Sequence, residues 1–171
     1  MVERIKNICD EKVFASVYKS YASDLYKFLY YKFGEHDALE DVVQEAFVKL
    51  WQHCRKITPE KARGFVWKTA NNMMLNKVKH DKVVLNYRKD VRPRVDLATP
   101  QYRLEEAEFY ERYQKALASL SEEQRVAFLL NKVEGKKHQE IAEMLGVTRK
   151  VVEYRIYSAF KKIKEALKNS E

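Results

Sequence analysis

The sequence predicts an all-α protein in which an N-terminal helical bundle and a C-terminal helix-turn-helix domain are joined by a basic linker. Only 4 Gly and 3 Pro occur in the 171 residues, so few turns are available. Apolar residues recur at spacings of three and four along most of the chain, as they do in amphipathic helices. Near the C-terminus, Ala142, Gly146 and Val152 have the spacing of a helix-turn-helix.

Three helices are expected in the first domain, which we place at residues 1–82. Apolar residues repeat on one face from about residue 10 to 33 and again from about 38 to 55, so two helices can pack as an antiparallel hairpin. Thr58 and Pro59 are suited to an N-cap and a first turn, but Gly64 follows, which predicts a separate short turn. A third helix over about residues 65–82, with either Leu75 or Met74 on its inward face, then closes the bundle.

The second domain is placed at residues 99–171, after a linker at 83–98 that loses the apolar repeat and carries several Lys and Arg. Its first helix begins after Thr99 and Pro100 and reaches Ser119. Ser121 and Gln124 have capping-box spacing for a helix that ends near residue 135. Two more helices are expected at about 138–145 and 148–168.

The last two helices have the features of a DNA-binding helix-turn-helix. Gly146 permits a left-handed turn, and Val152 anchors the second helix against the small Ala142. Outward residues of that helix can reach base edges in the major groove, while nearby cations can contact phosphates; the alternative is an ordinary solvated face. The base-reading candidates are Arg149, Lys150, Glu153, Tyr154 and Tyr157, and the phosphate candidates are Lys136, Lys137, Arg155, Lys161 and Lys162.

The charge balance also favours a polyanionic partner. Lys and Arg number 33 against 25 Asp and Glu, which gives a formal net charge of +8 and a pI near 9.3. Nucleic acid is the first candidate and a membrane surface the second. Because the sequence has no membrane-spanning apolar run and no signal pattern, we expect a soluble cytoplasmic protein without direct membrane insertion.

A polar stripe on the third helix is a second nucleic-acid candidate. Asn can hydrogen-bond base edges and an indole can stack on an unpaired base, which would suit melted single strands. The alternative is a hydrated helix face with a core tryptophan. The stripe consists of Lys68, Asn72, Asn76 and Lys79, flanked by Trp67 and Asn71.

Residues 35–45 are acidic and contain no Lys or Arg. With Gln44 and the outward Val48, this segment could dock a basic protein partner, although acidic residues at a helix start are also expected from the helix dipole. No catalytic motif or residue set, and no need for a cofactor, is evident, so an enzyme is not expected. Cys9, Cys54 and the four His lack metal-ligand spacing, and we interpret them as ordinary side chains without a metal site.

Three segments resemble extracytoplasmic-function (ECF) sigma factors of the sigma-70 family. ALEDVVQEAFVKLW at residues 38–51 resembles the polymerase-binding helix of that family, and FVWKTANN at 65–72 resembles the start of its promoter-melting helix. The segment at 117–125, with Leu-x-x-Leu-Ser-x-x-Gln-Arg, resembles the one that precedes its helix-turn-helix. The resemblance covers nearly the whole chain.

The resemblance implies a transcription initiation factor that directs RNA polymerase to promoters. It assigns core-polymerase binding to the helix with Asp41, Gln44, Glu45 and Val48, and the melted minus-ten element to Asn71, Asn72 and Asn76. The loop at about 53–63 would hold a flipped-out base, with Lys56, Lys61 and Arg63 on phosphates. The resemblance assigns the minus-thirty-five element to the last helix. The residues that would read it are Arg149, Lys150, Glu153, Tyr154, Tyr157 and Ser158.

The implied partners are core RNA polymerase, promoter DNA and an anti-sigma factor that masks the acidic segment. The alternative is a stand-alone helix-turn-helix regulator whose N-terminal bundle senses a ligand. That regulator would bind duplex DNA tightly without polymerase, as a dimer on two half-sites. A basic helical scaffold would instead bind DNA weakly and without regard to sequence.

Overall fold

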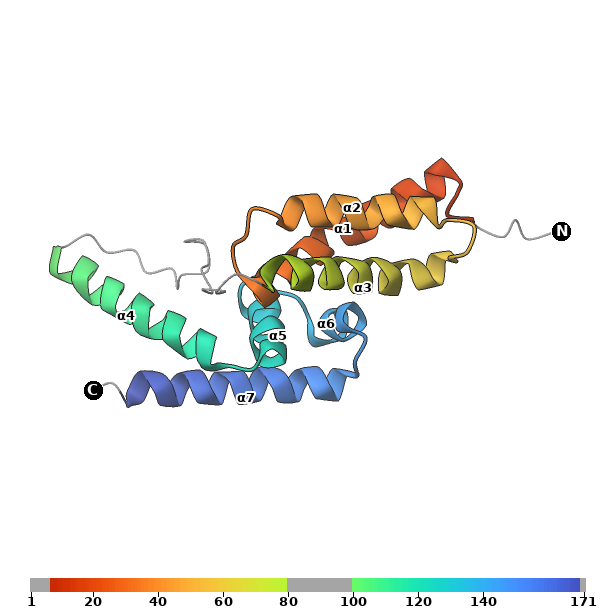
Figure 1. Cartoon of the computed structure of the whole chain (residues 1–171). Helices are drawn as coiled ribbons and strands as arrows, with labels where there is room; N and C mark the ends of the chain where they lie inside the picture. The colour runs from red at the N-terminus through yellow and green to blue at the C-terminus, as the bar shows by residue number, and fades with distance from the viewer. Residues whose placement is uncertain (1–6, 80–99, 170–171) are drawn as a thin grey trace. The chain divides into compact units, whose positions relative to one another are not determined.

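The computed structural model describes residues 7–79 and 100–169 (Figure 1). Seven helices and no strand lie in these two ranges, so the all-α prediction is confirmed. The helices form two compact units, one within residues 1–84 and one within 85–171. The predicted linker at 83–98 lies outside the described residues.

The first unit is a bundle of three helices, α1 (Glu11–Phe33), α2 (Leu39–Gln52) and α3 (Pro59–Val78). Each helix contacts the other two, and Figure 1 shows α2 and α3 side by side with α1 behind them. Asp10 caps α1 by accepting from the Lys12 backbone N–H at 2.9 Å. The apolar repeats face inward, and the fully buried side chains include Leu25, Leu29, Val42, Leu50 and Val66.

The start of α3 differs from the sequence-based prediction. The prediction of a separate turn before Gly64 is wrong, because α3 runs continuously from Pro59. Thr58 is its N-cap residue and has an extended backbone. Ala62 and Val66 are both fully buried, so packing on either side of Gly64 holds the helix through it. This packing offsets the cost of about 1 kcal/mol that Gly carries inside a helix.

The structure also decides between two candidates for the inward face of α3. Met74 is fully buried, whereas the Leu75 side chain is 46% exposed. Adjacent helical residues point about 100° apart, and here Met74 faces the core while Leu75 points away from it.

Cys9 and Cys54 form a disulfide with a Cα–Cα distance of 5.1 Å. Our interpretation of these cysteines as ordinary side chains is therefore wrong. The pairing joins the segment before α1 to the connection between α2 and α3, across 45 residues of sequence. Spacing rules read only local neighbours, and this contact is made by the tertiary fold.

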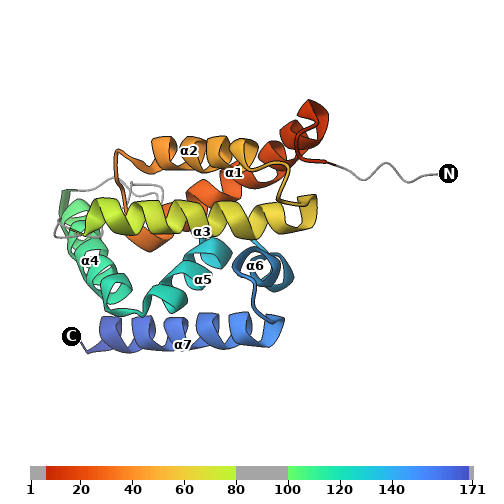
Figure 2. The ribbon, with the colours of Figure 1, turned by 45° about the vertical axis from the view of Figure 1, so that its right-hand side comes forward.

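The second unit contains α4 (Pro100–Ser119), α5 (Glu122–Lys132), α6 (His138–Leu145) and α7 (Arg149–Lys168). α7 contacts the other three helices, and α5 and α6 lie on the same side of it (Figure 2). The predicted capping box is confirmed, because the Gln124 N–H donates to Ser121 Oγ at 3.2 Å and the Ser121 N–H donates to Gln124 Oε1 at 3.3 Å.

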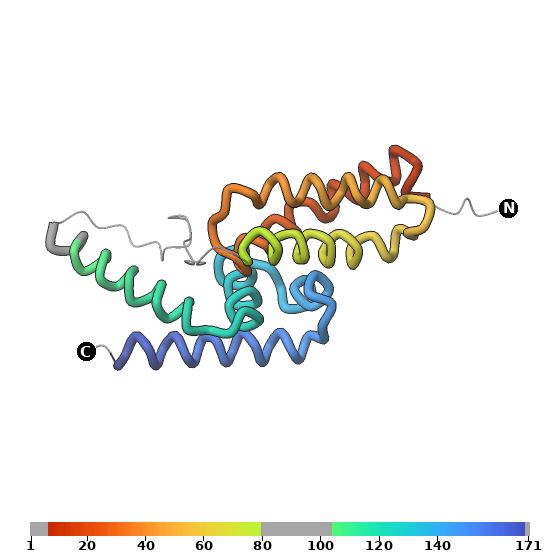
Figure 3. The backbone as a smooth tube through the Cα atoms, viewed as in Figure 1, coloured from red at the N-terminus to blue at the C-terminus, as the bar shows by residue number. Residues whose placement is uncertain are grey.

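The predicted helix-turn-helix is formed by α6 and α7, and Figure 3 follows the backbone through the turn between them. Gly146 has φ 67° and ψ 34°, the left-handed conformation that ends α6 at little steric cost. Ala142 and Val152 are buried, as expected. The apolar repeat of α7 fits either Ala159 or Phe160 on the inward face, and the structure selects Ala159, which is buried, whereas Phe160 is 50% exposed.

Candidate functional site

The expected polymerase-binding residues form one exposed surface on α2. Asp41, Gln44, Glu45 and Val48 are all exposed, and they follow one another at spacings of three, one and three. This places them on one helix face, opposite the side chains that enter the bundle core. The carboxylate of Glu45 is 3.7 Å from Lys49 Nζ, a solvent-exposed pair that contributes little to stability.

The C-terminal end of this surface is apolar. Val48 is 52% exposed, and Trp51, one turn further along, is 40% exposed. The Trp51 ring packs edge-on against Phe14 of α1 at 5.1 Å between centroids, so one side of it is fixed by the bundle. Sequence reasoning missed Trp51, although its spacing of three from Val48 is the signal for the same face. Apolar anchors within a polar rim are typical of protein-binding surfaces.

All four residues of the polar stripe predicted on α3 are exposed: Lys68, Asn72, Asn76 and Lys79. Helical geometry places Leu75 within the same stripe, so the exposed surface combines cations, amides and one apolar side chain. Leu75 is a second residue that sequence reasoning did not assign to a site.

The two flanking residues of the stripe turn inward. Trp67 is 9% exposed and packs against Tyr21 and Phe28, with centroid distances of 6.2 Å to each. The Cζ of Arg63 lies 5.5 Å from the Trp67 ring centroid. Asn71 is half-buried, and its Oδ1 is a buried atom without a hydrogen-bond partner. The structure therefore places the Trp67 ring in the core, where neither face is open to a base.

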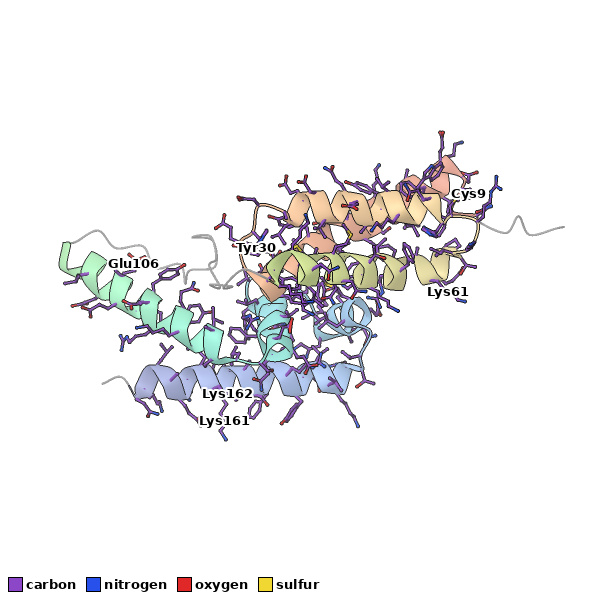
Figure 4. The ribbon with its side chains drawn as sticks, in the orientation of Figure 1. Cys9, Tyr30, Lys61, Glu106, Lys161 and Lys162 are labelled. Carbon is purple, nitrogen blue, oxygen red and sulfur yellow. A yellow bond between two sulfur atoms is a disulfide. The ribbon has the colours of Figure 1, made fainter. Side chains whose placement is uncertain are left out.

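Residues 53–58 connect α2 to α3, and we call them the connector. His53 anchors its start, since its backbone N–H donates to Lys49 O at 3.1 Å and its ring lies 5.8 Å from that of Phe65. Lys56 in the connector is exposed. Lys61 in the first turn of α3 is also exposed (Figure 4). The predicted loop thus presents cations in solvent, with Arg63 half-buried beside them.

The outer face of α7 carries two very exposed tyrosines. Tyr154 is 71% exposed and Tyr157 is 70% exposed. Lys150 precedes Tyr154 by four residues and Lys161 follows Tyr157 by four, so the four side chains form one stripe. Figure 4 shows Lys161 extending from α7 into solvent, whereas Lys162 Nζ donates to Gln124 Oε1 of α5 at 3.2 Å.

Other predicted residues of the second unit are tied to neighbours. Glu153 is paired with Arg149 and lies 3.6 Å from His138 Nδ1, which joins the starts of α6 and α7. Arg155 is 3.6 Å from Glu123 of α5, and its side chain is 18% exposed. Lys137 is exposed, whereas Lys136 and Ser158 are half-buried.

No group of three or more His, Cys, Asp or Glu side chains within residues 7–79 and 100–169 is arranged to hold a metal ion. In the same ranges, no helix is long and apolar enough to cross a membrane.

Both units match known families. Residues 17–83 match sigma-70 region 2, which spans the three-helix bundle and its α2 and α3 surfaces. Residues 110–163 match sigma-70, region 4, which includes the helix-turn-helix. The chain belongs to the sigma-70 family. The order of the two regions along the chain agrees with the resemblance found in the sequence.

A curated relative is the ECF RNA polymerase sigma factor SigE of Mycolicibacterium smegmatis, which is 26% identical over 153 residues. The match covers 87% of this chain and 59% of the relative, so the chain spans about 59% of that protein's length. This relative identifies the sigma-70 member as one of the ECF type.

Two solved structures have a similar fold. CnrH, solved in complex with the cytosolic domain of CnrY, has a TM-score of 0.55 and 22% identity, covering 95% of this chain and 92% of that one. The sigma factor RpoE, solved with the anti-sigma factor NepR from Bartonella quintana, has a TM-score of 0.50 and 21% identity, covering 92% and 98%. Because both sequence identities are below 25%, these two matches show a similarity of fold alone.

Proposed function

We propose that this ECF family member is an RNA polymerase sigma factor that directs core polymerase to specific promoters and promotes transcription initiation. The observation that carries the proposal is the exposed face of α2, where acidic and amide side chains surround Val48. A surface that combines exposed apolar side chains with polar ones suits a protein partner, and its negative charge is unsuited to DNA.

Core polymerase would bind the α2 face through Asp41, Gln44, Glu45 and Val48, with Trp51 extending its apolar end. Complementary charge on the polymerase would orient the encounter, while Val48 and Trp51 would lose their solvent exposure on binding. This part of the function needs no rearrangement of α2, since these side chains are already exposed.

The exposed stripe of α3 would trap the melted minus-ten strand. Asn72 and Asn76 offer amide donors and acceptors to base edges, Lys68 and Lys79 neutralise phosphates, and Leu75 covers an unstacked base. Lys56 and Lys61 would hold the backbone beside them, with Arg63 nearby. Trp67 and Asn71 would support this surface from within, because both are turned into the bundle.

The stripe on α7 would read the duplex minus-thirty-five element. Lys150 and Lys161 bracket Tyr154 and Tyr157, so cations lie at both ends of an aromatic surface. Apolar contact with the thymine methyl group is one means of reading a base in the major groove. Arg149, Glu153 and Ser158 border this stripe, and Lys136, Lys137 and Arg155 would contribute phosphate contacts.

The protein would supply binding energy and leave catalysis to the polymerase, so we do not propose an enzymatic activity. Its polymerase and promoter partners place it in the cytoplasm. CnrH and RpoE were solved with CnrY and NepR, and by analogy we propose an anti-sigma factor for this chain. That partner would cover the α2 face and so exclude polymerase.

Capture of bacterial core RNA polymerase by the purified full chain tests the proposal. The wild type should bind stoichiometrically, and Asp41→Ala combined with Gln44→Ala should weaken binding about tenfold or more, as loss of interface anchors does. Ser16→Ala combined with Ser23→Ala is the control, because both residues are exposed on the face of α1 opposite Phe14, which is the residue that packs against Trp51. Specific duplex binding by the protein alone, without polymerase capture, would instead identify a stand-alone regulator.

A further inference from the structure

The disulfide between Cys9 and Cys54 joins two segments that the three-helix bundle would otherwise hold separately. Cys9 precedes α1 and follows Ile8, which is fully buried. Cys54 is the second residue of the connector, and its backbone N–H donates to Trp51 O at 3.1 Å. The Cα–Cα distance of 5.1 Å lies within the usual range for disulfides, so the backbone holds the two cysteines in pairing position.

The bundle has other supports on both sides of this bond. Asp10 caps α1, Ile8 is packed in the core, and His53 is hydrogen-bonded to the end of α2. These contacts do not involve the sulfur atoms. Opening the disulfide therefore removes one restraint on the connector without removing the core of the bundle.

Both cysteines are half-buried, so small thiols and disulfides can reach them. A protein that acts with RNA polymerase works in a reducing compartment, where disulfides are usually transient or redox-sensing. This step rests on the proposed function. A cysteine pair held at bonding distance in such a protein suits reversible exchange better than permanent cross-linking.

We propose that Cys9 and Cys54 are a reversible redox modification site, which exchanges with low-molecular-weight disulfides and thiols such as the glutathione couple. In oxidation, one protein thiolate attacks glutathione disulfide, forms a mixed disulfide and releases one glutathione. The second cysteine then attacks the protein sulfur of the mixed disulfide and releases the second glutathione. The protein loses two electrons and two protons, and glutathione disulfide gains them.

The state of this site controls the connector. In the oxidised protein, the bond ties Cys54 to the segment before α1 and so restrains the connector, which carries Lys56 and leads into α3. In the reduced protein, the connector samples more conformations, so its cations are less well organised for a DNA backbone. Asp41, Gln44, Glu45 and Val48 of the α2 face are spared, since they lie within α2, six or more residues before Cys54.

The test is a redox titration of the native full chain in buffers of defined ratio of reduced to oxidised glutathione. Free thiols are trapped with a maleimide–polyethylene glycol and counted by gel shift. We expect one transition in which both thiols disappear together and reappear on reversal. Amide hydrogen exchange of residues 53–58 should be roughly tenfold faster in the reduced protein, with residues 41–50 unchanged.

Two results would overturn the proposal: two thiols that stay free in oxidised glutathione, or a disulfide that persists in excess reduced glutathione until the protein unfolds. Cys9→Ser provides a second check, because Cys54 should then accept a single glutathione reversibly; absence of that adduct also counts against it. The thiol count does not depend on polymerase binding. Failure to capture polymerase would therefore reject the proposed function without changing the result of the thiol titration.

Discussion

Arg149 Nε donates a hydrogen bond to Glu153 Oε1 at 2.9 Å, across one turn at the start of α7. The same carboxylate lies 3.6 Å from His138 Nδ1. Glu153 therefore holds Arg149 in place and at the same time puts a negative charge on the surface proposed to face DNA. Without Glu153, Arg149 could pair with a phosphate of any DNA sequence. The Arg149–Glu153 pair therefore favours sequence-selective over non-specific DNA binding.

Glu153→Gln should raise the affinity for non-specific duplex DNA by about two- to fivefold, because it removes the charge that competes with phosphate for Arg149. Fluorescence anisotropy with a random-sequence duplex at low salt measures this. Glu111→Gln is a matched control, since Glu111 pairs with Lys115 at 2.9 Å and lies on α4. An equal rise in the control would mean that net charge alone is responsible.

Leu75→Ala should reduce promoter opening by the holoenzyme while changing the free energy of unfolding by less than about 0.5 kcal/mol, because Leu75 is exposed. Permanganate reactivity of unpaired thymines measures opening, and urea denaturation measures stability. Met74→Ala should show the reverse, losing about 2–5 kcal/mol, since Met74 is fully buried. Normal opening by the Leu75 variant would remove this residue from the proposed minus-ten surface.

Two glycine substitutions should change the free energy of unfolding in opposite directions. Gly146→Ala should cost about 1–2 kcal/mol, because Gly146 holds φ 67° in the turn between α6 and α7. Gly64→Ala should stabilise by about 0.4–1 kcal/mol, since Gly64 lies inside α3 and an added Cβ meets nothing within 4 Å. Urea denaturation followed by circular dichroism compares both with the wild type. A destabilised Gly64 variant would show that this site requires glycine.

Burial raises the pKa of the Tyr113 hydroxyl in α4, which should make stability depend on alkaline pH. Below about pH 10, the ordinary tyrosine pKa, the hydroxyl is protonated whether the chain is folded or not. Above it, the unfolded chain releases the proton first, so the free energy of unfolding falls as pH rises. Urea midpoints at about pH 8 and pH 10.5 should fall less for Tyr113→Phe than for the wild type. Equal slopes would exclude Tyr113 as a cause.

The disulfide predicts a difference in heat stability between the two redox states. In the chain-entropy description, closing a loop of this size stabilises by about 4 kcal/mol, with about 2–4 kcal/mol typical in practice. Reduction should therefore lower the Tm of the first unit by roughly 10 °C or more. Thermal melts with and without reductant measure it, and Cys54→Ser should melt like the reduced wild type in both conditions. A Tm that ignores reductant would argue that no disulfide is present.

Local sequence was sufficient for most of the fold. The apolar repeats predicted the helices to within a few residues except at the start of α3, and the capping box at Ser121 and the turn at Gly146 were both found as expected. These features depend on residues within one or two helical turns of each other, so their physical causes lie in neighbouring positions. The exposed faces of α2 and α7 followed from the same repeats, because a residue opposite the buried stripe must face outward.

Tertiary packing settled the rest. The repeat allowed Met74 or Leu75, and Ala159 or Phe160, to face inward, and only the neighbouring helices select one of each. Packing also carried α3 through Gly64. It enclosed Trp67 between Tyr21 and Phe28, and it brought Cys9 to Cys54 across 45 residues. Each of these outcomes depends on a surface supplied by a distant part of the chain. Periodicity and spacing contain no information about such a surface.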